Sequence, residues 1–193
     1  MKTIKRKLLV VVLMLGTLVN YANNTELNNV LDAKKVKVVF KGAKKGNQLK
    51  IKDDSGVILH VEDISKKGNF IKFFDFSNLK DGDYTLELVK DFEVIIKSIN
   101  LDGKKVVFDE ETSEKIFKPV IRNEKNRLMI SQIAFDKKPL EVKIYYNNEI
   151  IYSETVKGNS IINRIYRLDE VMTGDYKVVL RNNGRNYSKE FKF

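Results

Sequence analysis

Gly82-Asp83-Tyr84-Thr85-Leu86-Glu87-Leu88 is one of two copies of the same pattern, and the other is Gly174-Asp175-Tyr176-Lys177-Val178-Val179-Leu180. In each copy a Gly-Asp turn precedes a tyrosine, after which aliphatic residues occupy alternate positions. Successive residues of a β-strand point to opposite faces, so the tyrosine and those aliphatic residues share one face. The pattern therefore predicts a turn followed by a half-buried strand, twice in one chain.

The position of the tyrosine adds a prediction about the fold. At the head of such a strand it matches the tyrosine corner of immunoglobulin-like sandwiches, where the hydroxyl bonds to backbone a few residues upstream. We therefore expect Gly82 and Gly174 to form the turns, and Tyr84 and Tyr176 to form the corners. The predicted fold is all-β, with two tandem immunoglobulin-like (fibronectin III-like) β-sandwich domains after an N-terminal signal peptide.

The repeat also predicts domain boundaries, because further segments recur in the same order at a spacing of about 91 residues, such as the strands beginning at Leu49 and Leu140. The expected organisation is a signal peptide (1–22), a leader (23–35), a first sandwich (36–103), a linker with a short strand (104–126) and a second sandwich (127–193). The linker is expected to be short and stiff, because Pro119 restricts the residue before it to extended conformations.

The first residues carry a targeting pattern. Lys2 and the basic residues 5–7 precede an apolar run from Leu8 to Val19, and Ala22 offers a cleavage position. This run is shorter than the roughly 20 residues that a membrane span needs, so the mature chain is expected to lack a span. We expect export to the periplasm or the cell exterior; a retained N-terminal anchor is the alternative. Because the chain has no cysteine, it is not expected to be a lipoprotein or to contain disulfides.

Charge and composition bear on the class of partner. The chain carries a net charge of +10, and removal of residues 1–22 takes away four positive charges, which leaves 10 − 4 = +6. The remaining basic residues are interspersed with acidic ones, which favours a solvated surface over a nucleic-acid groove, so no nucleic-acid partner is expected. A hydrophobic content of 42% is enough for two sandwich cores.

Few residues are suited to catalysis or metal binding. His60 is the only histidine, and without cysteine or a second histidine the chain lacks the groups for a serine-type triad or a histidine-based metal site. His60 is expected at an edge or facing solvent. We therefore predict a non-enzymatic protein without a cofactor.

The acidic turns leave two alternatives open. Paired carboxylates, Asp53 with Asp54 and Asp81 with Asp83, could serve acid-base chemistry, but each pair lies in a turn beside glycine, and turn formation explains them. Asp75, Asp81 and Asp83 could offer oxygen ligands to calcium, although no loop has a recognised ligand spacing. No metal site is predicted.

Aromatic residues provide the candidate interaction surface. In Phe73-Phe74 and Tyr145-Tyr146, adjacent residues face opposite sides of a strand, so one member of each pair must leave its own core. With Tyr152 and Tyr166, such residues could contact a protein or a sugar, and the predicted interaction surface consists of Phe73, Tyr145 and Tyr152. Packing against the neighbouring module or the linker is the alternative interpretation.

The order of these segments also resembles a known family. A Leu-x-Ile strand, an Asp/Asn-type hairpin, a Lys-Gly-Asn turn, a Phe/Tyr-rich strand and a Gly-Asp-Tyr strand run through Leu49–Leu101 and again through Leu140–Phe193. This order resembles the small immunoglobulin-like domains of secreted Bacteroidetes proteins, which include the C-terminal sorting domain of type IX secretion cargo. The resemblance implies an exported sandwich protein and supplies a sorting role as one functional alternative.

The function expected from the sequence is protein–protein interaction at the cell envelope or outside the cell. Edge strands and outward aromatic side chains would make the contacts, with the sheets as rigid support. A carbohydrate-binding module and a type IX secretion sorting module are the two alternatives.

Overall fold

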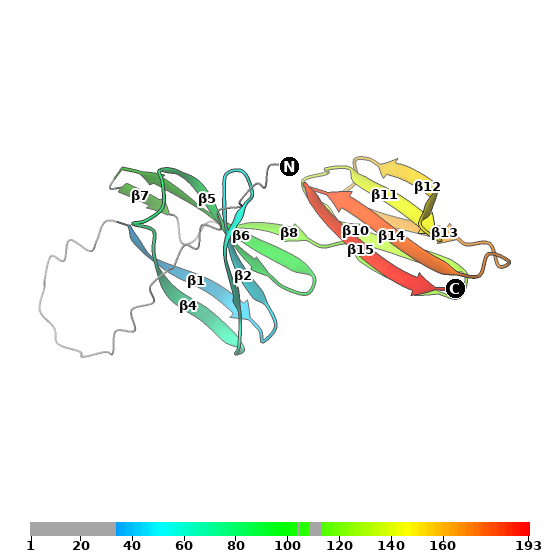
Figure 1. Cartoon of the computed structure of the whole chain (residues 1–193), viewed down its shortest axis with the longest axis horizontal. Helices are drawn as coiled ribbons and strands as arrows, with labels where there is room; N and C mark the ends of the chain where they lie inside the picture. Colours follow the sequence, from blue (N-terminus) through cyan, green and yellow to red (C-terminus); the bar gives the residue numbers. More distant parts are fainter. Residues whose placement is uncertain (1–33, 104, 109–112) are drawn as a thin grey trace, which may run out of the picture. The chain divides into compact units, whose positions relative to one another are not determined.

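The computed structural model describes residues 34–103, 105–108 and 113–193, and every regular element in them is a β-strand (Figure 1). The prediction of an all-β fold is confirmed. The chain divides into two compact units, Met1–Leu88 with Ile96–Ser113 and Val89–Ile95 with Glu114–Phe193. The expected signal peptide at 1–22 and residues 23–33 of the expected leader lie outside the described residues.

The strands of the first unit form two antiparallel sheets. One contains β1 and β4, and the other has the order β3-β2-β5-β6-β7. The strands are β1 (Lys35–Ala43), β2 (Gln48–Asp53), β3 (Ile58–Asp63), β4 (Gly68–Asp75), β5 (Gly82–Val89), β6 (Glu93–Asp102) and β7 (Lys105–Phe108).

Buried apolar side chains of the first unit come from both sheets. They occupy alternate positions, as Val36, Val38 and Phe40 do in β1 and Leu86 and Leu88 do in β5. This alternation is the one expected from the sequence, and it gives each sheet one apolar face.

The opposite face of β5 is not simply exposed. Glu87 points away from the apolar core, yet this residue is only 3% exposed, and its carboxylate pairs with the Lys52 ammonium of β2 at 2.9 Å. A largely buried carboxylate needs such a partner to offset its lost hydration. An ion pair between Lys52 and Glu87 therefore covers the outer face of this sheet where β2 and β5 are adjacent.

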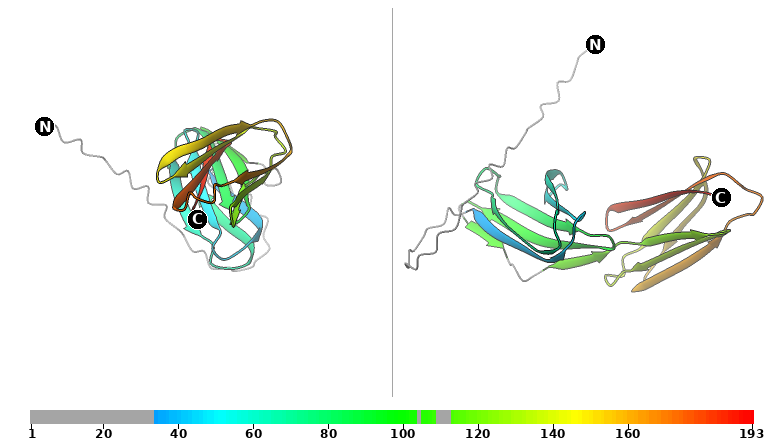
Figure 2. Two further views of the ribbon diagram at one scale, coloured as in Figure 1. Left: turned by 90° about the vertical axis from the view of Figure 1, so that its right-hand side faces the viewer. Right: turned by 90° about the horizontal axis from the view of Figure 1, so that it is seen from below.

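The second unit contains a three-stranded sheet, β13-β10-β9, and a four-stranded sheet, β12-β11-β14-β15. Figures 1 and 2 show the two sheets as separate layers. These strands are β9 (Val120–Glu124), β10 (Arg127–Ile133), β11 (Leu140–Tyr146), β12 (Glu149–Val156), β13 (Ile161–Arg167), β14 (Asp175–Asn182) and β15 (Arg185–Lys192). The short strand β8 (Glu114–Phe117) belongs to neither sheet and pairs with β6. This unit also includes Val89–Ile95, where the Lys118 amide donates to the Phe92 carbonyl at 2.8 Å.

The core of the second unit joins its two sheets. Leu128 and Ile130 of β10 belong to one buried cluster with Val142 of β11 and with Val178 and Leu180 of β14. Consecutive strands change sheet from β10 to β11, from β12 to β13 and from β13 to β14. The second unit is thus a β-sandwich-like arrangement around a single apolar core.

Both predicted tyrosine hydrogen bonds are present. The Tyr84 hydroxyl at the start of β5 donates to the Lys80 carbonyl at 2.8 Å, and the Tyr176 hydroxyl at the start of β14 donates to the Met172 carbonyl at the same distance. Burial raises the pKa of both hydroxyls above the ordinary value, so both remain protonated donors. Each bond ties the start of a central strand to the loop before it.

The two glycines of the repeated pattern are needed for different reasons. Gly82 has φ +144°, a conformation that side chains rarely adopt, while a Cβ at this position would meet no atom within 4 Å. At Gly174 a Cβ would lie 2.8 Å from Cε2 of Tyr146, which is closer than real Cβ contacts. The first turn therefore requires glycine for its backbone and the second for its space.

Residues 104–126 contain the short strand expected in the linker, and further strands besides. The part up to Phe108 includes β7, which pairs with β6 through Leu101–Val106 and its neighbours. Val120–Glu124 forms β9, which pairs with β10 through a tight turn at Lys125-Asn126. Because β9 completes the three-stranded sheet, the second unit begins before residue 127 and includes the segment after Pro119.

Candidate functional site

The three aromatic residues chosen from the sequence lie on three different strands. Phe73 is in β4 of the first unit and is 68% exposed. Tyr145 lies in β11 of the second unit, on the outer face of the four-stranded sheet. Tyr152 in β12 stands opposite the buried Ile144, on the side of the strand that faces the other sheet. Tyr145 and Tyr152 lie on opposite sides of the same sheet and Phe73 belongs to the other unit, so each is assigned to a separate candidate region.

Phe73 and Tyr152 belong to strands that carry most of the exposed apolar side chains. Of the fifteen large hydrophobic residues that are exposed in the described part of the chain, nine lie on β3, β4, β12 and β13. They are Ile58, Val61, Ile71, Phe73, Ile150, Ile151, Tyr152, Ile161 and Ile165.

These strands are edge strands in the described sheets. β3 is the outermost strand of the sheet β3-β2-β5-β6-β7, next to β2. β12 is at the edge of the four-stranded sheet and β13 at the edge of the three-stranded sheet, while β4 pairs only with β1 among the described strands. We call the two strand pairs the β3–β4 edge and the β12–β13 edge. Each unit therefore presents exposed apolar side chains at the same two positions of its strand order.

A cluster of polar and aromatic side chains connects the two strands of the β12–β13 edge. The Glu154 carboxylate accepts a hydrogen bond from the Tyr166 hydroxyl at 2.8 Å and one from Arg164 Nε at 3.3 Å. The rings of Tyr152 and Tyr166 lie 5.3 Å apart. The hydrogen bond from Tyr166 and the charge of Arg164 lower the pKa of Glu154, while burial and Glu154 raise the pKa of Tyr166. Since β12 and β13 belong to different sheets, the cluster joins the sheets at this edge.

The first unit has an equivalent cluster 92 residues earlier, formed by His60, Glu62, Lys72 and Phe74. Lys72 donates to Glu62, His60 Nε2 lies 3.5 Å from the same carboxylate, and the His60 and Phe74 rings meet edge to face at 6.0 Å. His60 is therefore at an edge, as expected from the sequence, but it packs against a ring instead of facing solvent. The sequence contained this information, since both halves have a ring-x-Glu and a cation-x-ring segment at matching spacing.

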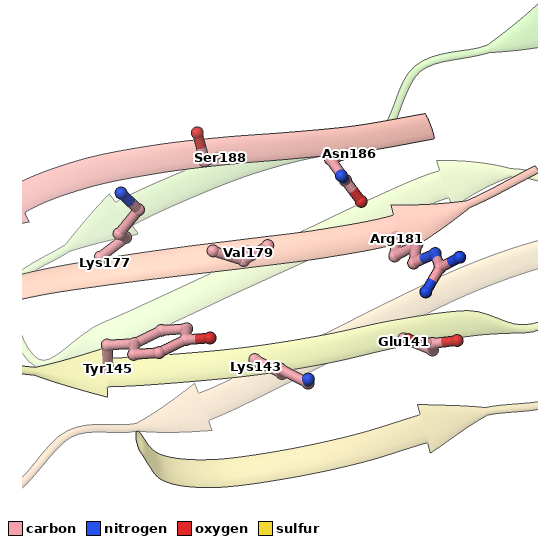
Figure 3. A pocket seen from close by; sticks show the side chains of 8 residues that line it. All are labelled: Glu141, Lys143, Tyr145, Lys177, Val179, Arg181, Asn186 and Ser188. Atoms are coloured by element: carbon pink, nitrogen blue, oxygen red, sulfur yellow. The ribbon is translucent and has the colours of Figure 1, made fainter. Parts of the chain in front are cut away.

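Tyr145 lies at one end of an open hollow of about 390 Å³ on the outer face of the four-stranded sheet (Figure 3). The residues that line the hollow alternate along β11 and β14 with the buried Val142, Ile144, Val178 and Leu180. The lining side chains therefore point outward, away from the core. The hollow is lined by Glu141, Lys143 and Tyr145 of β11, Lys177, Val179 and Arg181 of β14, and Asn186 and Ser188 of β15.

The charges around the hollow are mainly positive. The Lys177 ammonium pairs with the Glu190 carboxylate at 2.8 Å, which raises the pKa of the lysine and lowers that of the glutamate. Lys143 and Arg181 have no ion-pair partner within the described residues. The hollow thus has two cationic groups that are available to a ligand.

The acidic turn residues are each used locally. Asp75 accepts a hydrogen bond from the Ser77 amide, Asp81 pairs with Lys34 at 3.3 Å, and Asp83 accepts one from the Asn100 amide group. Asp53 accepts hydrogen bonds from Ser55 Oγ and from the Val57 amide, which shape its hairpin turn. Across the described residues, no three acidic, histidine or cysteine side chains are grouped so that they could hold a metal ion.

No protein-family model matches this sequence, and no protein of known function is significantly similar to it. Among the residues that the structure describes, no helix has the length and apolar character needed to cross a membrane.

Proposed function

We propose that this chain is a non-enzymatic exported protein of two tandem immunoglobulin-like modules, which binds a protein partner at the cell envelope or outside the cell. The observation that carries the proposal is the concentration of exposed apolar side chains on the β3–β4 edge and the β12–β13 edge. Exposed apolar side chains beside an unpaired strand edge are typical of interaction sites.

The immunoglobulin-like assignment is supported by strand order. If β9 to β15 are taken in sequence as strands A, B, C, C′, E, F and G, the sheets become E-B-A and C′-C-F-G, the fibronectin III-like order. Tyr176 then stands at the start of strand F, the position of the tyrosine corner. In the first unit β1 to β6 fill the positions B, C, C′, E, F and G, with Tyr84 at the start of F.

The edges offer two kinds of contact. An edge strand has backbone N–H and C=O groups that are not used by a neighbouring strand, so an extended segment of a partner can pair with it. The exposed side chains beside it, such as Ile161 and Ile165 on β13, then supply apolar area to the interface. The Glu154 cluster holds β12 and β13 together, and rigid support of this kind lowers the entropic cost of binding.

Site-specific photo-cross-linking tests the proposal. A photoreactive amino acid placed at Phe73 or at Ile165 in the full chain, expressed in its own cells, is expected to form an adduct with the same protein. With the photoreactive amino acid at the exposed Asn163, which lies between the two residues on the same face of β13, Ile161→Ser combined with Ile165→Ser should weaken the adduct about tenfold, since the loss of about 1.4 kcal/mol of apolar contact has that effect.

Val171 provides the matched control, because it is 84% exposed but lies in the loop between β13 and β14. Cross-linker at position 171 and the Val171→Ser variant should leave the adduct pattern unchanged. Adducts that form equally from position 171, or that survive the double serine variant, would contradict binding at the edges.

A further inference from the structure

We propose that the hollow on the outer face of the four-stranded sheet binds an acidic saccharide, with the sugar carboxylate held between Lys143 and Arg181. This inference does not rest on the proposed protein partner. The hollow involves β11, β14 and β15 and shares none of its lining residues with the β12–β13 edge.

A comparison of the two units shows that the hollow is specific to the second. Tyr84 and Tyr176 are equivalent and 92 residues apart, so Glu87 corresponds to Val179. Ile51 stands opposite His60 and Ile144 stands opposite Tyr152, so Lys52 corresponds to Tyr145. Where the first unit closes this face with the Lys52–Glu87 ion pair, the second unit has an apolar floor and an aromatic wall.

The cations in the second unit are arranged for an anionic group. Arg181 lies opposite Glu141 and Lys143 lies opposite Val179, so the two side chains flank the Val179 floor from neighbouring strands. Figure 3 shows Arg181 and Glu141 at one end, Lys143 along the side and Tyr145 with Lys177 at the other end. Arginine offers paired N–H groups in a fork that matches a carboxylate, and a lysine adds a second charge.

The other lining groups suit a sugar ring. Tyr145 offers a partly buried ring face to the C–H groups of a pyranose, and Asn186 and Ser188 offer an amide and a hydroxyl to sugar hydroxyls. The volume of the hollow, about 390 Å³, falls in the range of small-molecule sites. Ligand position would thus be set by stacking at one end and by charge pairing at the other.

An acidic peptide fits this face less well. β14 is hydrogen-bonded to β11 on one side and to β15 on the other, so its backbone groups are already paired. A peptide could not add a strand there, so it would gain no backbone hydrogen bonds with the sheet. A saccharide requires only the side-chain groups that the hollow provides.

Calorimetric titration of the full chain with trigalacturonate, neutral galactotriose and a tri-glutamate peptide tests the inference. Trigalacturonate should bind at least tenfold more tightly than either of the other probes. Arg181→Gln and Tyr145→Ala should each weaken trigalacturonate binding at least tenfold, while Lys157→Gln, at an exposed lysine in the loop between β12 and β13, should leave it unchanged.

Ile161→Ser with Ile165→Ser should bind trigalacturonate normally, so failure of this inference and failure of the proposed protein contact are distinguishable. Equal binding of galactotriose or of the glutamate peptide would overturn the inference. An equal loss of trigalacturonate affinity in Arg181→Gln and Lys157→Gln would also overturn it, because that result indicates attraction by the overall positive charge and not binding at a defined site.

Discussion

At the scale of single residues, the repeated Gly-Asp-Tyr pattern combines one shared role with one that differs. The tyrosine hydroxyls make equivalent bonds to Lys80 and Met172. The glycines do not have equivalent surroundings, because Gly82 is constrained by its backbone conformation and Gly174 by the nearby Tyr146 ring. Sequence identity at these positions therefore does not imply the same physical requirement.

Substitution of the two glycines is expected to separate these requirements. Gly174→Ala should lower the free energy of unfolding by about 1–3 kcal/mol through overpacking against Tyr146. Gly82→Ala should cost a similar amount, about 1–3 kcal/mol, through backbone strain. Urea denaturation of both variants, with and without Tyr146→Ala, measures the difference.

The second substitution distinguishes the two causes. Tyr146→Ala removes the ring that a Cβ at position 174 would meet, so in that background Gly174→Ala should have little further effect. Gly82→Ala should cost the same in both backgrounds. A Gly174→Ala cost that persists without the Tyr146 ring would show that backbone conformation is the constraint there too.

At the scale of elements, the cluster across the β12–β13 edge makes stability depend on pH. The folded state lowers the pKa of Glu154 below its ordinary value of 4.5, chiefly through the hydrogen bond from Tyr166. A carboxyl of this kind stabilises the fold above its unfolded pKa, and this contribution is lost as the pH falls through the folded pKa. The contribution should be complete at neutral pH and absent in strong acid.

Glu154→Gln is expected to cost about 1 kcal/mol at pH 7, a modest value because the side chain is 28% exposed. The difference from the unaltered chain should shrink as the pH is lowered below 4.5. Thermal unfolding between pH 3 and pH 7 measures it, with Glu149→Gln at the exposed start of β12 as the control. A cost that is independent of pH would exclude the ionised carboxylate as its source.

Strands were predicted correctly where apolar and polar residues alternate over five or more positions. The prediction failed in a short segment without this alternation. Leu140–Ile144 and Tyr176–Leu180 alternate cleanly, and their inward faces are the predicted ones. Val120–Glu124 falls in the predicted linker, because Pro119 indicates an extended connection and five residues are too few to show a strand pattern. The turn from this strand to β10 contains Lys125 with φ +49°. Lysine is not among the residue types that indicate a tight turn in a sequence.

The face of Tyr152 was the least predictable part of the candidate site. It follows Ile150-Ile151 in a run without alternation, and the pairing of β11 with β12 shifts between Ile144 and Tyr145. A shift of one residue exchanges the two faces of a strand, so the run alone could not place the ring. Spacing did not reveal the hollow around Tyr145 either, since its walls come from three strands that only the sheet brings together.

At the scale of the whole molecule, the described residues form two compact units, each with its own set of buried apolar side chains. Leu88 and Leu180 are equivalent, fully buried residues of β5 and β14, 92 positions apart. Each belongs to a different compact unit. Loss of a buried leucine side chain typically costs about 2–5 kcal/mol, which should be confined to the unit that contains it.

Amide hydrogen exchange on the full chain tests this claim most directly. Leu180→Ala should accelerate exchange in β10, β11 and β14 at least about 30-fold, as about 2 kcal/mol requires, and leave β1, β2 and β4 unchanged. Leu88→Ala should produce the reverse. Equal acceleration in both sets of strands, from either substitution, would contradict separate cores and indicate a single cooperative fold.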